Sequence, residues 1–244
     1  MSAQLSSELL KLRTTRMAGL LLLAAAGLTL LGVFVEGASA SAAELAGDRQ
    51  QRTLLGAGSS GAVFFATLAG LLTVTSEFRY GTIRPTLLVQ PRRRIVLAAK
   101  LTAAALAGVV LALVCIALSL AAGLAILAVR GVELVPSGAD LIALAAGTIA
   151  AAALSALLGV AIGALIRNQV GAIVAVVAYA FLVDATLFAA TPDVGRFLPG
   201  KAGDALAGQP VDHLLSPGAG ALALIAWTLA IVFAATMRTE RSDV

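Results

Sequence analysis

Few side chains of this sequence are placed for covalent chemistry. Ser59 and Ser60 lie between two glycines, Gly58 and Gly61, and the only histidine of the chain is His213. Serine hydrolysis needs a nucleophile and a base within hydrogen-bond reach of each other. A serine of this segment together with His213 is therefore the one candidate pair for a hydrolytic site.

Phosphate and metal chemistry lack the residues that they require. The sequence has no G-x-x-x-x-G-K-[ST] phosphate loop, so it does not bind ATP by that route. Its single cysteine, Cys115, excludes an intrachain disulfide, and with one histidine it cannot form a His/Cys metal cluster. We therefore expect that the chain is not an enzyme and binds no cofactor itself.

The composition indicates a membrane protein. Hydrophobic residues make up 60% of the 244 residues and charged residues 12%, whereas soluble domains have about 45–50% and about 25%. The apolar residues also occur in long uncharged blocks, which favours a location in the bilayer. We interpret the net charge of +4 as a matter of membrane topology and expect no nucleic-acid partner.

Six apolar blocks are long enough to cross the hydrocarbon as helices, which takes about 17–25 residues. They cover residues 17–35, 57–75, 97–129, 139–166, 170–190 and 217–236. The third and fourth blocks exceed one crossing, so we expect them to tilt or to project beyond the bilayer. The pattern predicts an all-α polytopic membrane protein, with residues 1–244 forming a single transmembrane domain.

The basic residues favour one orientation of these spans. If both termini are cytoplasmic, most Lys and Arg residues face the cytoplasm, as the positive-inside rule requires. These residues are Lys11, Arg13, Arg16, Arg79, Arg84, Arg92, Arg93, Arg94, Lys100, Arg167, Arg238 and Arg241. We expect a multi-pass protein of the plasma (inner) membrane.

Residues 1–16 precede the first span. Leu5, Leu9 and Leu12 recur on one helical face, which predicts a short amphipathic helix in the cytoplasmic interface. A frayed basic tail is the alternative. A signal peptide cleaved near residues 38–40 is a further alternative, which the long polar preface and the spanning length of the block disfavour.

The loop between spans two and three, residues 76–95, has the most informative local pattern. Gly81 can end the second helix in a left-handed conformation. Thr82 can cap a new short helix that tolerates Pro85 in its first turn. Pro91 would stop that helix, so the loop is predicted to be structured.

The predicted helix presents Ile83, Leu87 and Leu88 beside Arg84. An isolated helix with three large apolar side chains either lies on lipid headgroups or docks into a partner. The sequence therefore predicts an interaction surface in this loop.

The loop resembles that of the permeases of type-2 ABC exporters, in particular the stand-alone six-span permeases of the actinobacterial type. Residues 77–82 (EFRYGT), 91–93 (PRR) and 99–101 (AKL) occur in the family's order. Further segments that resemble the family are residues 7–16 (elbow helix), 167–172 (the turn between spans four and five) and 197–200 (the outer segment before the last span).

The resemblance implies a second permease copy, in a homodimer or heterodimer, and a separate cytoplasmic ABC ATPase that binds ATP and Mg. The short helix would be a coupling helix in a groove of that ATPase, with membrane lipid around the spans. The implied coupling residues are Glu77, Phe78, Arg79, Gly81, Thr82, Ile83, Arg84, Leu87 and Leu88. Glu77 and Arg79 are expected to make ionic contacts at this joint, and the alternative is that they snorkel at the membrane surface.

Asp184 is a carboxylate within the fifth apolar block, where the family often has Glu. An intramembrane carboxylate is functional by default, so one expectation is that it lines the translocation path. The alternative is that it reaches interfacial water and only stabilises the bundle.

Two other functions remain open at this point. Residues 58–61 resemble the GxSG element of rhomboid-type intramembrane proteases, although His213 precedes the last span instead of lying within a helix. A small-residue packing motif explains the segment as well. An autonomous secondary carrier is the other alternative, which the lack of an internal repeat disfavours.

Gly159 with Gly163, and Ala104 with Gly108, have the spacing of close helix packing.

Overall fold

The computed structural model describes residues 2–89 and 92–241 and confirms the predicted all-α polytopic fold. Six helical segments of the described chain are long and apolar enough to cross a membrane. They are α2 (Arg16–Ser39), α4 and α5 (Asp48–Gly56 and Gly58–Arg79), α7 (Arg93–Arg130), α8 (Gly138–Ile166), the fifth span (α9, Gln169–Ala178; η1, Tyr179–Asp184; α10, Ala185–Ala190) and α13 (Pro217–Arg241).

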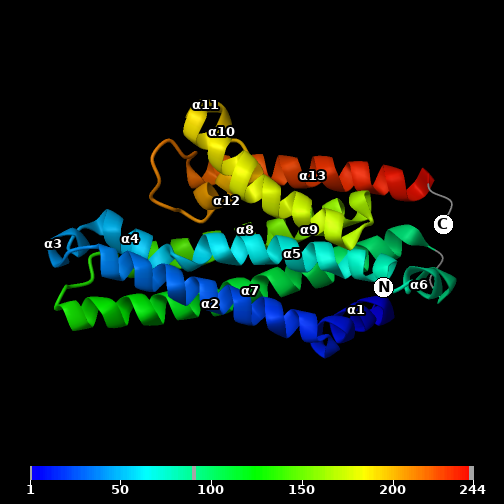
Figure 1. Ribbon diagram of the computed structural model, residues 1–244, viewed down its shortest axis with the longest axis horizontal. Helices are drawn as coiled ribbons and strands as arrows, with labels where there is room; N and C mark the ends of the chain where they lie inside the picture. Colours follow the sequence, from blue (N-terminus) through cyan, green and yellow to red (C-terminus); the bar gives the residue numbers. More distant parts are fainter. Residues whose placement is uncertain (1, 90–91, 242–244) are drawn as a thin grey trace.

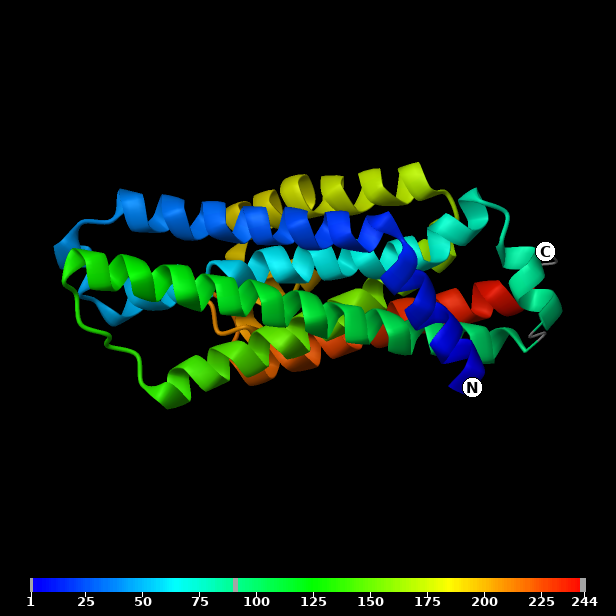
Figure 2. The same ribbon diagram turned by 90° about the horizontal axis from the view of Figure 1, so that it is seen from below.

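Short helices lie at both ends of this elongated bundle. They are α1 (Ser2–Thr14), α3 (Ala42–Leu45), α6 (Ile83–Val89), α11 (Pro192–Gly195) and α12 (Pro199–Leu206). Figures 1 and 2 show α1, α6 and the last turns of α13 at one end of the bundle, called here the α6 end, and α3 at the opposite end, called the α3 end. The α10–α12 segment lies on one flank, towards the α3 end.

The third span, α7, is longer than one crossing requires, as predicted. It has 38 residues, which corresponds to about 57 Å at 1.5 Å per residue. Even at a tilt of about 40°, the largest usually found, it would cover about 44 Å, and the hydrocarbon is about 30 Å thick. The helix therefore extends beyond the hydrocarbon.

The centre of the bundle is a close contact between α5 and α8. A Cβ on Gly70 of α5 would overlap the carbonyl oxygen of Ala156, and one on Gly159 of α8 would overlap that of Thr67. A Cβ on Gly163 would lie 2.8 Å from another α5 carbonyl. The predicted packing role of Gly159 and Gly163 is confirmed, because only glycine lets the two backbones touch here.

The α7 helix joins this pair through the second predicted small-residue motif. A Cβ on Gly108 would lie 2.7 Å from Ala152 O of α8, and Ala104 is fully buried. Three spans thus form a tightly packed core, against which the other spans are arranged.

We predict that Gly159→Ala destabilises the protein and that Gly27→Ala does not. The added methyl at Gly159 meets a backbone carbonyl that cannot move aside, and overpacking costs about 1–3 kcal/mol. Gly27 of α2 has no neighbouring atom within 4 Å of the added Cβ, so alanine there is neutral or stabilises the helix by up to about 1 kcal/mol. Thermal unfolding of the detergent-solubilised proteins measures both effects, and equal midpoints for the two variants would contradict the backbone contact.

Candidate functional site

Gly81 ends α5 in the turn before α6, as predicted. Gly81 adopts φ +69°, in the left-handed region. The N–H of Thr82 donates to the carbonyl of Glu77 at 3.0 Å, which is the six-to-one bond of a Schellman motif. The end of α5 is therefore closed by the backbone, and the chain leaves it in a defined direction.

The short helix α6 follows at once and presents an exposed leucine. Pro85 lies in its first turn, as predicted, and Ile83 is half-buried. Leu88 is 85% exposed, and α6 lies at the extreme end of the bundle (Figure 2). The predicted contributions of Arg84, Leu87 and Pro91 fall on side chains or residues outside the described part of the chain.

Glu77 faces the interior and belongs to a cluster of four charges. Lys11 Nζ lies 2.6 Å from Glu77 Oε1 and 2.8 Å from Glu8 Oε1. Lys100 Nζ lies 2.7 Å from Glu77 Oε1 and 2.8 Å from Glu8 Oε2. We call Glu8, Lys11, Glu77 and Lys100 the four-charge cluster; it joins α1, α5 and α7.

Three of the four cluster members are buried and the Lys11 side chain is 43% exposed, so the buried charges have to compensate each other. Glu8, Glu77 and Lys100 are 3%, 4% and 2% exposed. Lys100 Nζ also donates to Thr73 O at 3.1 Å. Two carboxylates and two ammonium groups give no net charge, which is the condition under which ions are tolerated away from water.

The two cluster members outside the spans show shifted pKa values. Burial acts to raise the pKa of Glu8, but Lys100 and then Lys11 outweigh it and hold the pKa below its ordinary value of 4.5. Burial acts to lower the pKa of Lys11, but its bonds to Glu77 and Glu8 outweigh it, and the pKa lies above 10.5. Both groups are therefore charged at neutral pH.

The two residues after Glu77 connect α5 to the turn between α8 and α9. Phe78 packs against the core, and the guanidinium of Arg167 lies 5.5 Å from the centre of its ring. Arg79 is exposed, with Nη1 3.5 Å from Oε1 of Gln169. Of the two predicted ionic contacts, Arg79 faces outward and Glu77 is turned into the protein.

Sequence reasoning missed the other members of the cluster. No role was predicted for Glu8, and Lys11 and Lys100 were used only as cytoplasmic basic residues and as parts of segments that resemble the family. A usable signal existed: a lone lysine inside the third apolar block needs a carboxylate partner. The predicted helix at the N-terminus is confirmed as α1, with Glu8 buried in the bundle.

The remaining candidate residues lie towards the α3 end. Asp184 is 5% exposed and lies beside α12. Ser60 donates to Asp204 Oδ1 at 2.9 Å, and His213 is exposed in the loop after α12. In the described part of the chain, the hydrogen-bond partner of the Ser60 hydroxyl is therefore the carboxylate of Asp204.

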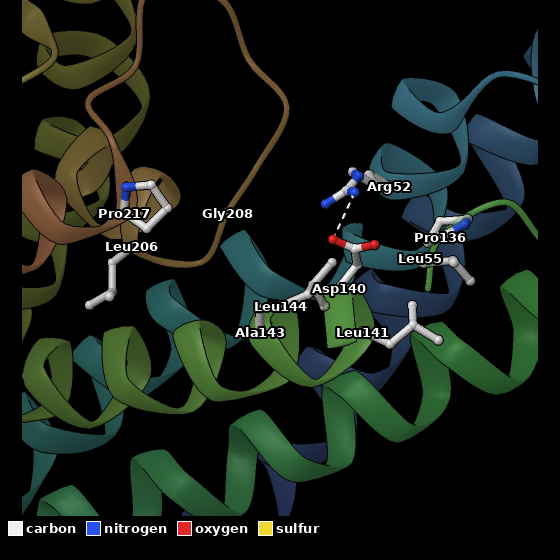
Figure 3. A pocket seen from close by; sticks show the side chains of 10 residues that line it. All are labelled: Arg52, Leu55, Pro136, Asp140, Leu141, Ala143, Leu144, Leu206, Gly208 and Pro217. Carbon is white, nitrogen blue, oxygen red and sulfur yellow. Dashed lines mark ion pairs between the residues drawn. The ribbon is translucent and has the colours of Figure 1, made fainter. Parts of the chain in front are cut away.

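A pocket of about 220 Å³ also lies towards the α3 end. Figure 3 shows Arg52 and Asp140 directed towards each other at its wall, and their charged atoms are 2.9 Å apart. The rest of the lining is mostly aliphatic and includes Leu55, Leu144 and Leu206. Because Arg52 also pairs with Asp48 at 2.8 Å, the pocket wall has no uncompensated cation for an anionic ligand.

We predict that Lys100→Met is strongly destabilising. It leaves two buried carboxylates with one ammonium group, and loss of one partner from a buried ion pair costs about 3–5 kcal/mol. Arg49→Met is the matched control, because the Arg49–Asp212 pair has exposed side chains (61% and 71%) and should contribute little to stability. Thermal unfolding compares the two, and similar losses would show that the cluster does not hold α1, α5 and α7 together.

We also predict a defined pH range for this stabilisation. The contribution of Glu8 is present above its ordinary pKa of 4.5 and is lost as the pH falls through the lowered folded-state pKa. The contribution of Lys11 is present below 10.5 and is lost as the pH rises through its raised pKa. In Lys100→Met the acid loss should begin at higher pH, since Lys100 is the main group that lowers the pKa of Glu8. Unfolding midpoints measured across pH test this, and an unmoved acid limb would refute it.

Comparison with known proteins agrees with this architecture. No curated protein matches the sequence at a significant level. The family model described as "ABC-2 family transporter protein" matches residues 4–183, which include most of α1, all of α6, the four-charge cluster and the first four spans. This match covers well over half of the chain, and the six membrane-length helices fit a type-2 ABC permease. The chain therefore belongs to the ABC-2 family of transporter membrane proteins.

Proposed function

We propose that this chain is the permease of an ATP-driven exporter whose ATPase is a separate cytoplasmic subunit, and that α6 is the helix that docks into it. The observation that carries the proposal is the exposure of Leu88 on a helix at the extreme end of the bundle. Together with the half-buried Ile83 of the same short helix, this side chain is available to an apolar surface of a partner. A groove on the ATPase would provide it.

The attachment of α6 supports a role in transmitting movement. The Schellman turn joins α6 to α5, and Glu77, two residues before the end of α5, joins α5 to α1 and α7. A displacement of α6 would therefore act on three elements as one packed body. In this proposal Glu77 acts by positioning α6, and the exposed Arg79 is available to an acidic group of the ATPase.

The assembly would contain two permease copies, as a homodimer or a heterodimer, in the plasma membrane with both termini cytoplasmic. ATP and Mg would be bound by the partner subunits. The direction of transport follows from the resemblance to exporters. The family match favours this reading over a secondary carrier, and the bond of Ser60 to Asp204 favours it over a serine protease.

We predict that Leu88→Asp reduces capture of the ATPase by this chain. A candidate ATPase encoded beside the permease would be co-expressed with the tagged permease and purified from mild detergent. Burying a carboxylate in an apolar groove without a partner is strongly unfavourable, so we expect at least about a ten-fold lower yield, equal to about 1.4 kcal/mol. Ile83→Asp should act in the same direction.

Val129→Asp is the matched control for this experiment. Val129 is 87% exposed near the end of α7, at the α3 end, so its substitution adds the same charge at an exposed apolar position away from α6. We expect it to leave the ATPase yield unchanged. Full yields for both Leu88→Asp and Ile83→Asp would leave lipid headgroups as the surface that α6 contacts and would overturn the docking role.

A further inference from the structure

The fifth span changes its helical geometry just before Asp184. Residues Tyr179–Asp184 form the π-helical turn η1 between the α-helices α9 and α10. Such turns are rare and occur frequently at functional sites. Leu182 and Val183 are 63% and 40% exposed, whereas Asp184 is 5% exposed. An otherwise apolar span therefore directs one carboxylate into the protein.

This carboxylate lies against the first turn of α12. A Cβ added to Gly200, the second residue of α12, would lie 2.6 Å from Asp184 Oδ2. Position 200 therefore has no room for a side chain while Asp184 stays in place. The first N–H groups of a helix lack partners within it and favour a negative charge. Lys201 Nζ adds a longer ion pair, 3.9 Å from Asp184 Oδ2.

The remaining contacts of α12 are with other spans. Gly220 of α13 and Gly147 of α8 lie directly against its backbone, where an added Cβ would meet carbonyl oxygens. Asp204 of α12 accepts a hydrogen bond from Ser60 of α5 at 2.9 Å. α12 is thus packed on α5, α8 and α13, and Asp184 links its N-terminal end to the fifth span.

We propose that Asp184 is a positioning residue that ties α12 to the fifth span. In this role Asp184 links two helices. It differs from a residue of the translocation path, whose charge would face the substrate. Leu206, at the other end of α12, lines the pocket of Figure 3. A movement of the fifth span would therefore be carried through α12 to the pocket wall. That last step rests on the proposed function, whereas the link itself does not.

A disulfide can replace the link without a charge. An ideal Cβ at position 200 lies 2.8 Å from Asp184 Cγ, close to where the sulfur of a cysteine at position 184 would lie. The pair Asp184→Cys and Gly200→Cys is therefore within disulfide reach. All variants carry Cys115→Ala, because Cys115 is the only native cysteine. The readout is amide hydrogen exchange of the full chain in lipid nanodiscs, with the α8 amides as internal control.

In Asp184→Ala we expect the α12 amides to exchange about ten-fold faster or more, with α8 unchanged. Asp184→Asn keeps the shape and one acceptor oxygen, so its increase should be smaller. Oxidation of the double-cysteine protein should restore slow exchange at α12, and reduction should abolish the effect.

Two results would overturn the positioning role. One is unchanged exchange at α12 in both Asp184→Ala and Asp184→Asn. The other is fast exchange at α12 in a double-cysteine protein whose disulfide is verified by mass spectrometry. Capture of the ATPase through α6 is measured separately at the α6 end, so a failure of the proposed function would be seen there and not at α12.

Discussion

A charge buried near the membrane surface must be matched by an opposite charge, and this constraint arranges the α6 end of the protein. Each ammonium group of the four-charge cluster lies within 2.8 Å of both carboxylates. Removal of any one of the four groups would leave a buried charge without its full compensation. The four contacts therefore hold α1, α5 and α7 together. The position of α6 follows, because Glu77 lies just before the turn from which α6 starts.

Close backbone packing stabilises the middle of the bundle, whereas charged contacts stabilise its ends. The backbones of α5 and α8 touch at Gly70 and Gly159, which leaves no side chains there to rearrange. In contrast, α2 and the fifth span each have only 17% of their most apolar stretch buried, compared with 61% for α4–α5 and 56% for α8. The α5–α8 pair is therefore a fixed core, and the peripheral spans depend on a few contacts, such as that of Asp184, for their position.

The features that sequence predicted are those that depend on local chemistry. Length and hydropathy were enough for six spans, and Gly81 was predicted to be left-handed because other residues adopt that conformation at a cost. The four-charge cluster was not predicted, because Glu8 and Lys100 are 92 residues apart and a single sequence does not indicate which carboxylate meets which lysine. The π-turn before Asp184 was also missed, since its apolar residues have the same pattern as an ordinary helix. Glu77 was expected at a partner surface. Its burial could not be predicted, because it depends on lysines that approach it from elsewhere in the chain.

The two carboxylates of the cluster make different contacts with the two lysines. Glu8 gives one oxygen to each lysine, and because Lys11 lies on the same helix, a shift of α1 against α7 would break only its bond to Lys100. Glu77 uses Oε1 for both lysines, and its Oε2 is buried without a hydrogen-bond partner in the described chain. An unsatisfied buried acceptor costs about 1–3 kcal/mol, and a small rotation of α5 that brings Oε2 to one ammonium group would recover part of it. The end of α5, from which α6 starts, therefore holds a buried carboxylate oxygen that a small rotation of this helix would satisfy, and this supports the proposed role of α6 in transmitting movement.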